Sequence, residues 1–152
     1  MNATFFDSSS FVKLFVAETG SPELIDFVTR SEDRSRFVSV LAPLEVRSAI
    51  RRREAMGDIR PQDARQALHS LSEEMRRLVE HPISEQILSE AAALVDRHSL
   101  RALDAIQLAS ALLAKLTLRL QDSLTFVASD QRLLEAALKE GLATWDPSVV
   151  QA

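Results

Sequence analysis

Residues 3–15 read ATFFDSSSFVKLF, an apolar run that enters a single aspartate, Asp7, followed by three serines and a second apolar run. Residues 3–7 have the apolar, β-prone composition of a short buried strand. The spacing of the apolar residues over 9–18 predicts a helix after it. A carboxylate between a buried strand and a buried helix is costly unless something compensates its charge. Asp7 is therefore the first candidate site residue.

The composition is that of an ordinary globular chain. Its 152 residues are 46% hydrophobic and 26% charged, which favours a single domain over residues 1–152. The absence of cysteine excludes disulfides and thiolate metal sites. With no visible leader or membrane-spanning run, we expect a cytoplasmic protein without a membrane partner. The formal net charge of −4 requires any nucleic-acid surface to be local.

Strand-like and helix-like patterns alternate along the rest of the chain. Further strands are expected at residues 36–41 and 124–130, and an edge strand at 142–147. Helices are expected at residues 21–31, 42–57, 60–80, 85–98, 100–116 and 131–141, with 81–84 as a short connector. This alternation is typical of an α/β fold with a central, mainly parallel sheet flanked by helices, a three-layer α/β/α arrangement.

Four acidic residues stand at comparable places in this pattern. Asp7 and Asp130 end strands, Glu45 lies in the first turn after a strand, and Asp104 lies near the start of a helix. Because parallel strands end at one edge of a sheet, we expect these carboxylates to meet there. Close carboxylates do not all stay ionised without a cation, and Mg²⁺ and Mn²⁺ prefer oxygen ligands. The pattern predicts a metal site suited to phosphodiester cleavage.

Each acid taken alone has a simpler interpretation. An acid after a strand often caps a helix, whose N-terminus favours negative charge by about 0.3–1 kcal/mol. Asp104 is harder to explain this way, because it interrupts an apolar stretch. Ser9 is a candidate to hold a carboxylate or a metal-bound water. Lys13, about one helical turn past the serines, is expected to be exposed.

Four motifs together resemble the PIN-domain ribonucleases, and most closely the VapC toxins of bacterial and archaeal type II toxin–antitoxin pairs. They are FFDSSSFVKLFVAETGS around Asp7, PLEVRSAIRRR around Glu45, LRALDAIQLASAL around Asp104 and TFVASDQRLLEAA around Asp130. Each motif is short, but the ordered set covers nearly the whole chain. The resemblance implies a PIN-like domain of the three-layer kind.

One position departs from the family pattern. The last motif usually has a hydroxyl residue two positions before its aspartate, where this chain has Ala128, with Ser129 next to it. The resemblance still implies Asp130 as the fourth acid. It makes Ser129, together with Ser9, a candidate supporting residue around the acids.

The resemblance also implies an activity and a partner. The activity is Mg²⁺- or Mn²⁺-dependent endonucleolytic cleavage of RNA to 5′-phosphate and 3′-hydroxyl ends, which inhibits translation or growth. Asp7 and Asp104 would be direct metal ligands, while Glu45 and Asp130 would hold a metal-bound water or a second ion. The partner would be a VapB-like antitoxin that blocks the site, and the assembly a homodimer, a heterotetramer or a larger complex.

Basic residues lie beside two of the acids. Arg47, Arg51 and their neighbours at positions 52 and 53 follow Glu45, and Arg101 precedes Asp104. These arginines are candidates to contact RNA phosphates near the metal. The alternative is a solvated helix face that pairs with local acids.

Two other functions stay open at this point: a PIN-like binding module without catalysis, and an RNA-processing nuclease outside a toxin–antitoxin pair. An aspartyl phosphotransferase is disfavoured, because Ser9 stands where the common phosphatase motif has its second aspartate. A receiver domain is disfavoured because the late strand ends in Asp130 where a lysine is needed.

Overall fold

The computed structural model describes residues 2–31 and 34–149. Within them a parallel sheet has five strands in the order β3-β2-β1-β4-β5. The strands are β1 (Asn2–Phe6), β2 (Ser35–Ser39), β3 (Val79–His81), β4 (Ser123–Val127) and β5 (Ala143–Trp145). The helices are α1 (Ser8–Phe11), the 3-10 turn η1 (Val12–Leu14), α2 (Ser21–Arg30), α3 (Ala42–Ala55), α4 (Pro61–Met75), α5 (Glu85–His98), α6 (Ala102–Leu116) and α7 (Gln131–Lys139).

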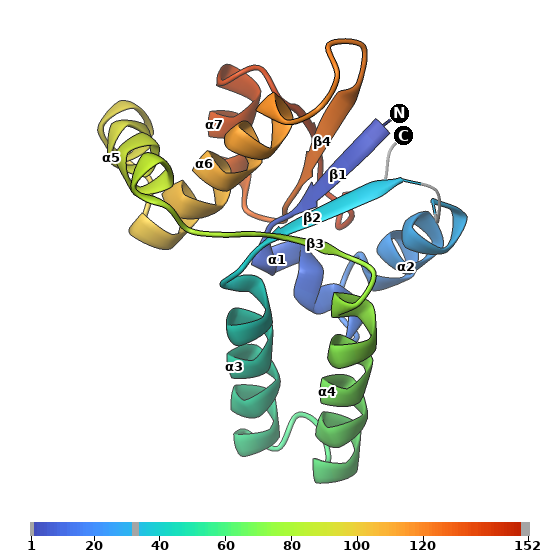
Figure 1. The fold of residues 1–152 in the computed structure, drawn as a ribbon. Helices are drawn as coiled ribbons and strands as arrows, with labels where there is room; N and C mark the ends of the chain where they lie inside the picture. Colours follow the sequence, from blue (N-terminus) through green and yellow to red (C-terminus); the bar gives the residue numbers. More distant parts are fainter. Residues whose placement is uncertain (1, 32–33, 150–152) are drawn as a thin grey trace.

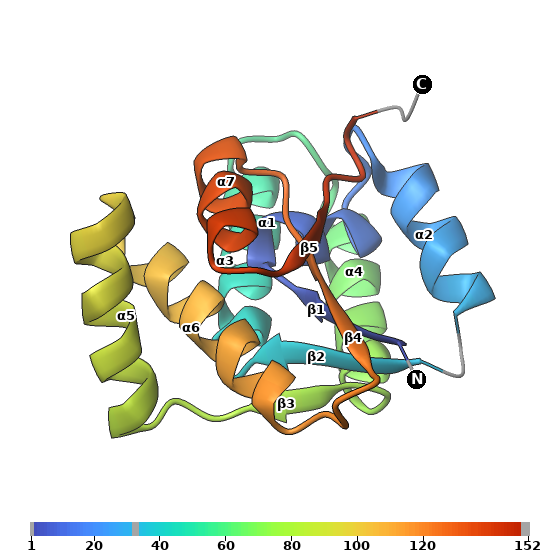
Figure 2. The ribbon, with the colours of Figure 1, turned by 90° about the horizontal axis from the view of Figure 1, so that it is seen from above.

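Helices cover both faces of the sheet, which confirms the expected three-layer α/β/α fold (Figures 1 and 2). One core lies between the sheet and α5, α6 and α7, and there the rings of Phe5 and Phe126 stack with centroids 5.9 Å apart. The other core lies between the opposite face and α1 to α4, and it contains Phe6 and Val38. Neighbouring residues of a strand point to opposite faces, so Phe5 and Phe6 belong to different cores.

The strand order places a crevice beside β1. The chain continues from β1 outward to β2 and β3, and later returns to add β4 and β5 on the other side. In such parallel sheets the connections leave β1 and β4 in opposite directions, which opens a crevice at the carboxyl ends of these two strands. The antiparallel hairpin of α3 and α4 projects from this same edge of the sheet (Figure 1).

The first helix is much shorter than expected. Residues 9–18 were predicted to be helical, but α1 is a single turn and η1 ends at Leu14. Lys13, expected at the surface, is 6% exposed, and its Nζ donates to the carbonyl oxygen of Thr19 at 2.9 Å. The chain folds back after η1, so the lysine stem becomes buried while its ammonium keeps a hydrogen-bond acceptor.

The stretch 60–80 was also predicted wrongly as one helix. Helix α4 ends at Met75, and Val79–His81 form β3, which pairs with β2. A three-residue strand leaves too short a pattern to be separated from the end of a helix. The unpaired backbone edge of β2 determines the conformation of these residues, and this is a tertiary effect.

Two further expectations concern the whole chain. Of the residues 1–152 expected to form one domain, residues 1, 32, 33 and 150–152 lie outside the described part. Within the described part, no helix has both the length and the apolar character needed to cross a membrane.

The candidate edge strand at 142–147 is confirmed as β5.

Candidate active site

Asp7 is held at the end of the central strand. Its backbone N–H donates to the carbonyl oxygen of Val127 at 2.9 Å, which joins the ends of β1 and β4. Its Oδ2 accepts from the backbone N–H of Ser9 at 3.0 Å and from Ser9 Oγ at 2.5 Å. Asp7 therefore caps α1, which confirms the helix-cap interpretation of this acid. It is only 4% exposed, so the cap is also a buried charge.

The three serines after Asp7 have three different partners. Ser10 Oγ donates to the carbonyl oxygen of Val127 at 2.7 Å. Ser9 Oγ, besides donating to Asp7, accepts from the backbone N–H of Ser129 at 3.0 Å. Ser8 Oγ donates to Glu45 Oε2 on α3. The serine run therefore ties the end of β1 to the end of β4 and to the helix that carries the second acid.

Glu45 reaches the site from the first turn of α3. Its Oε2 accepts from Ser8 Oγ and, at 2.7 Å, from Nε2 of Gln107 on α6. Gln107 is buried, and its Nε2 also lies 3.0 Å from Ser8 Oγ. Sequence reasoning missed both Ser8 and Gln107. The available signal for Gln107 was a polar residue inside an otherwise apolar helix.

Asp104 and Asp130 complete the group of acids from the other side of the crevice. Asp104 is half-buried in the first turn of α6. Asp130 is exposed, and its Oδ1 accepts from the backbone N–H of Leu133, so it caps α7. Capping is thus a real role of Asp130, and this role leaves its second carboxylate oxygen for other partners.

The charges of neighbouring acids act on the pKa of Asp7 and of Asp104. Burial, with a smaller contribution from the charges of Asp104 and Glu45, raises the pKa of Asp7 from 3.8 to about 6 against the hydrogen bonds of Ser9. Burial also raises the pKa of Asp104, where the charges of Asp130 and Glu45 add and the Arg101 guanidinium opposes. Four separate segments therefore bring their carboxylates together. We call these four residues the acidic cluster: Asp7, Glu45, Asp104 and Asp130.

The acidic cluster fits a divalent cation by its donor chemistry. In the described residues, no three acidic or imidazole side chains are already arranged to hold a metal ion. However, Asp7 Oδ1, Glu45 Oε1 and the Asp104 carboxylate accept no hydrogen bond from any described residue. These are hard oxygen donors of the kind Mg²⁺ and Mn²⁺ prefer. A cation among them would offset the burial of charge, and the smaller repulsion between the acids, that raise the pKa of Asp7 and Asp104.

A fifth acid, Asp146, stands behind Asp130 and was missed in the sequence. Its Oδ1 accepts from Ser129 Oγ and its Oδ2 from Gln131 Nε2, each at 3.1 Å. The Ser129 hydroxyl, a candidate supporting group for the acids, is thus bonded to Asp146. Asp146 follows Trp145 at the end of β5, so the same strand-end pattern that marked the other acids was available for it. It holds both neighbours of Asp130.

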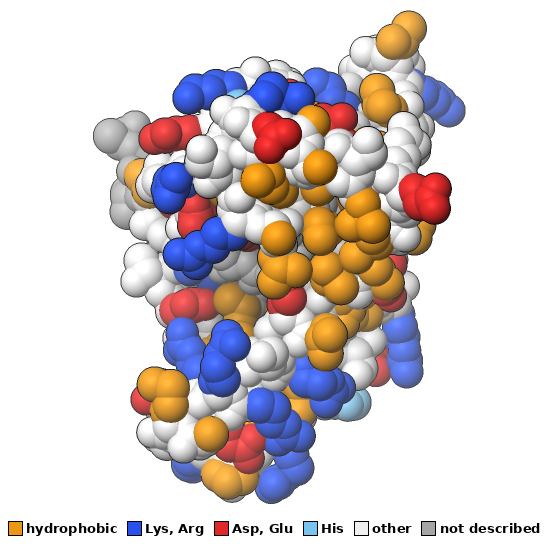
Figure 3. All heavy atoms as spheres, turned by 90° about the vertical axis from the view of Figure 1, so that its left-hand side faces the viewer, with side chains coloured by type: hydrophobic (Ala, Val, Ile, Leu, Met, Phe, Trp, Pro, Cys, Tyr) orange, Lys and Arg blue, Asp and Glu red, His pale blue; other side chains and the backbone are white. Residues whose placement is uncertain are grey.

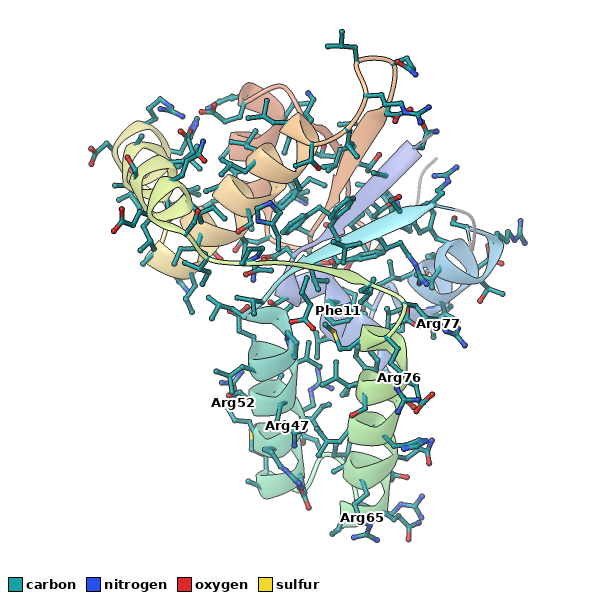
Figure 4. The ribbon with its side chains drawn as sticks, in the orientation of Figure 1. Phe11, Arg47, Arg52, Arg65, Arg76 and Arg77 are labelled. Carbon is teal, nitrogen blue, oxygen red and sulfur yellow. The ribbon has the colours of Figure 1, made fainter. Side chains whose placement is uncertain are left out.

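The candidate RNA-contacting arginines differ in their partners. Arg51 Nη1 pairs with Glu54 at 2.7 Å on the same helix. Arg47 is exposed and makes no ion pair with another described residue (Figure 4). Arg101 is exposed beside the first turn of α6, where its charge acts on Asp104. Lys and Arg side chains gather over the α3–α4 hairpin, in the lower part of the molecule (Figure 3).

The chain is similar to proteins of known structure over most of its length. PAE2754 from Pyrobaculum aerophilum is 17% identical, with 93% of this chain and 88% of that chain covered and a TM-score of 0.65. A chain of the DNA-bound VapBC from Salmonella typhimurium is 14% identical, with 97% and 99% covered and a TM-score of 0.63. A chain of FitAcB from Neisseria gonorrhoeae is 15% identical, with 95% and 97% covered and a TM-score of 0.61. At these identities the likeness establishes the fold.

Most of the chain matches one protein family. No curated protein matches the sequence. The PIN domain matches residues 4–139, a span that contains all four acids of the acidic cluster. Because this match covers most of the chain, the protein belongs to the PIN-domain family.

Proposed function

We propose that this protein is a Mg²⁺- or Mn²⁺-dependent endoribonuclease that acts as the toxin of a toxin–antitoxin pair. PIN domains are nucleases as a class, so family membership supports hydrolysis of nucleic acid. The observation that carries the proposal is the acidic cluster, whose members come from four segments and whose charges add to burial in raising the pKa of Asp7 and of Asp104 at the crevice between β1 and β4. The proposal treats residues 1–152 as one working domain in the cytoplasm.

Asp7 and Asp104 are the proposed metal ligands. When bound, the ion would polarise the phosphate and lower the pKa of an attacking water. Ser9 holds Oδ2 of Asp7 and leaves Oδ1 for the ion. Glu45, held through Oε2, keeps Oε1 to orient a water by hydrogen bonding. Asp130 would complete the charge balance at the open side, where a substrate enters.

RNA would approach along the face of α3 and the start of α6. Arg101, whose charge acts on Asp104, and Arg47, which is exposed two residues after Glu45 on α3, are proposed to contact phosphates. Arg51 would do so by leaving its ion pair with Glu54. RNA binding would depend on these few arginines, because the whole chain carries a net charge of −4. Phosphate contacts of this kind position RNA without reading its sequence.

A VapB-like antitoxin is the proposed protein partner. Several proteins of similar fold come from complexes, including a toxin–antitoxin complex from Klebsiella pneumoniae and VapBC from Salmonella typhimurium. The antitoxin would block the acidic cluster, and release from it would let the enzyme inhibit translation and growth. A homodimer, alone or within a heterotetramer or larger complex, is the proposed assembly.

The first test is RNA cleavage by the purified chain, freed of any antitoxin. Total RNA is incubated with Mg²⁺, with Mn²⁺ and with excess chelator, beside an Asp7→Asn variant and an Asp96→Asn control on the exposed side of α5. We expect discrete cuts with 5′-phosphate ends that require metal, at least about 100-fold slower in Asp7→Asn. Intact RNA in every metal, with all three proteins folded, would favour the non-catalytic binding module.

The toxin role needs a separate test in cells. Induced expression of the wild-type chain is expected to arrest growth, whereas Asp7→Asn and Asp104→Asn at the same protein level are not. Growth that continues under a chain shown to cleave RNA in vitro would favour an RNA-processing nuclease outside a toxin–antitoxin pair.

A further inference from the structure

A buried amide connects three of the segments that build the acidic cluster. Gln107 lies on α6 three residues after Asp104, about one helical turn further along the same side. It is 2% exposed. Its Nε2 lies 2.7 Å from Glu45 Oε2 and 3.0 Å from Ser8 Oγ, and Ser8 itself donates to Glu45 Oε2. The amide thus joins α6 to α3 and to α1.

Two of these hydrogen bonds, from Ser8 Oγ and from Gln107 Nε2, converge on one oxygen of Glu45. Oε2 receives both donors, while Oε1 receives none from the described residues. A carboxylate held in this way has one rotational setting, with its second oxygen directed away from the donors. The charge of Glu45 acts on Asp7 and on Asp104, so the held carboxylate lies within electrostatic reach of both.

We propose that Gln107 is a positioning residue, which together with Ser8 fixes the Glu45 carboxylate relative to Asp7 and Asp104. The proposal rests on the metal-dependent nuclease function proposed above. Gln107 acts through Glu45 and contacts neither metal nor RNA. Groups that orient metal-site carboxylates commonly change metal affinity or activity by 10- to 100-fold when they are removed, roughly the effect expected here.

Packing alone does not account for an amide at this position. Gln107 Oε1 is buried and has no hydrogen-bond partner among the described residues. A buried acceptor without a hydrogen-bond partner destabilises the folded state. Ala111, four residues further on the same face of α6, is buried in the apolar core, so an aliphatic side chain at position 107 would suit this face without this cost. The hydrogen bonds that Nε2 donates therefore explain the amide at this position.

The test removes the donor and keeps the volume. Gln107→Met and Gln107→Leu are compared with Ser110→Ala, a matched control on the next turn of α6. Ser110 is equally buried, and its Oγ donates to the backbone carbonyl of Ile106. Two readouts are taken: the Mg²⁺ concentration for half-maximal RNA cleavage, and Mn²⁺ binding to the protein alone by electron paramagnetic resonance.

We expect Gln107→Met and Gln107→Leu to raise the half-saturating metal concentration about 10-fold while thermal stability is kept or increased. Ser110→Ala is expected to leave the metal requirement unchanged. In a Glu45→Gln background, the Gln107 substitutions should have no further effect on Mn²⁺ binding, because the group they position has already lost its charge.

Two results would overturn the proposal. One is a wild-type metal requirement in a folded Gln107→Met or Gln107→Leu protein. The other is an equal loss of Mn²⁺ binding with and without the Glu45 carboxylate, which would show that Gln107 does not act through it. If the wild-type chain cleaves no RNA, the nuclease function fails, and the Mn²⁺ readout still decides whether Gln107 positions a metal site.

Discussion

Asp7 is a buried carboxylate whose hydrogen bonds come from one residue, Ser9. Those two bonds do not offset burial, and the pKa of Asp7 is raised to about 6. Between about pH 4 and pH 6 the Asp7 carboxyl group therefore keeps its proton in the folded protein, whereas in the unfolded chain it has lost it. The contribution of Asp7 to the free energy of unfolding falls as the pH rises through this window. Without a cation, the buried and ionised Asp7 carboxylate therefore lowers the free energy of unfolding at neutral pH.

Asp7→Asn should therefore stabilise the metal-free protein at neutral pH. Asparagine keeps an oxygen for Ser9 but carries no charge. In excess chelator at pH 7.5, we expect its free energy of unfolding to exceed that of wild type by on the order of 2 kcal/mol. The difference should largely vanish at pH 4, where Asp7 is protonated. Urea denaturation at both pH values, with Asp96→Asn as control, checks this. A less stable Asp7→Asn at pH 7.5 would contradict it.

Gly20 and Gly57 form a matched pair for a second prediction at this scale. Both have positive φ, at 90° and 79°. A Cβ on Gly20 would lie 2.7 Å from the carbonyl carbon of Pro147, whereas a Cβ on Gly57 would meet nothing within 4 Å. Gly57→Ala should cost about 1 kcal/mol of unfolding free energy from its backbone conformation. Gly20→Ala should cost clearly more, because backbone atoms must move. Equal costs by urea denaturation would show that this close approach is unimportant.

At the scale of elements, a buried ion pair joins β2 to α4. Arg36 Nη1 pairs with Glu74 Oε1, and the Arg36 side chain is 6% exposed. Arg36 Nε is buried without a hydrogen-bond partner in the described part of the chain. Helix α4 belongs to the hairpin that projects from the site edge, so this pair fixes the base of that hairpin against the sheet.

Removing one partner of the pair should destabilise the protein strongly. Glu74→Leu leaves the Arg36 guanidinium buried without its counter-charge, and we expect a loss of about 3 kcal/mol. The double variant Arg36→Met with Glu74→Leu should recover most of this loss. Arg60→Ala, which removes an exposed pair with Asp63, should leave the free energy of unfolding nearly unchanged. A loss in Glu74→Leu no larger than this control, measured by urea denaturation, would contradict a structural role for the pair.

At the scale of the whole molecule, the acidic cluster links residues as distant in sequence as Asp7 and Asp130. The parts that carry these acids belong to both helical layers and to the sheet between them. The cluster exists in the folded chain and not in the unfolded one. A cation that binds it must therefore stabilise the whole fold.

Mg²⁺ should raise the melting temperature in proportion to the logarithm of its concentration once the site is filled. At 100 times the dissociation constant, the gain in unfolding free energy is about 2.7 kcal/mol. Asp7→Asn and Asp104→Asn should each lose most of this gain. Thermal scans at constant ionic strength, with NaCl in place of MgCl₂ as control, measure it. An equal rise with NaCl would mean general screening of the net charge of −4.

The metal-binding candidates and much of the fold were readable from the sequence because their signals are local. A strand that leads into an acid at a helix start is visible within about ten residues: Asp7 and Asp130 stand at the strand end, and Glu45 stands in the first turn of the helix that follows. The parallel arrangement follows from the alternation of strands and helices. That these acids, with Asp104, form a site with metal-ligand roles stays a prediction until metal binding is measured.

Other features were decided by tertiary structure. Strand β3 depends on the open edge of β2, and the burial of Lys13 depends on a turn that returns the chain to Thr19. The contacts of Ser8 and Gln107 with Glu45 join positions 37 and 62 residues apart. Sequence patterns report which side of an element is apolar, because burial repeats with the helix or strand period. They do not report which polar side chains meet across elements, because hydrogen bonds between them form only after the helices have packed around the sheet.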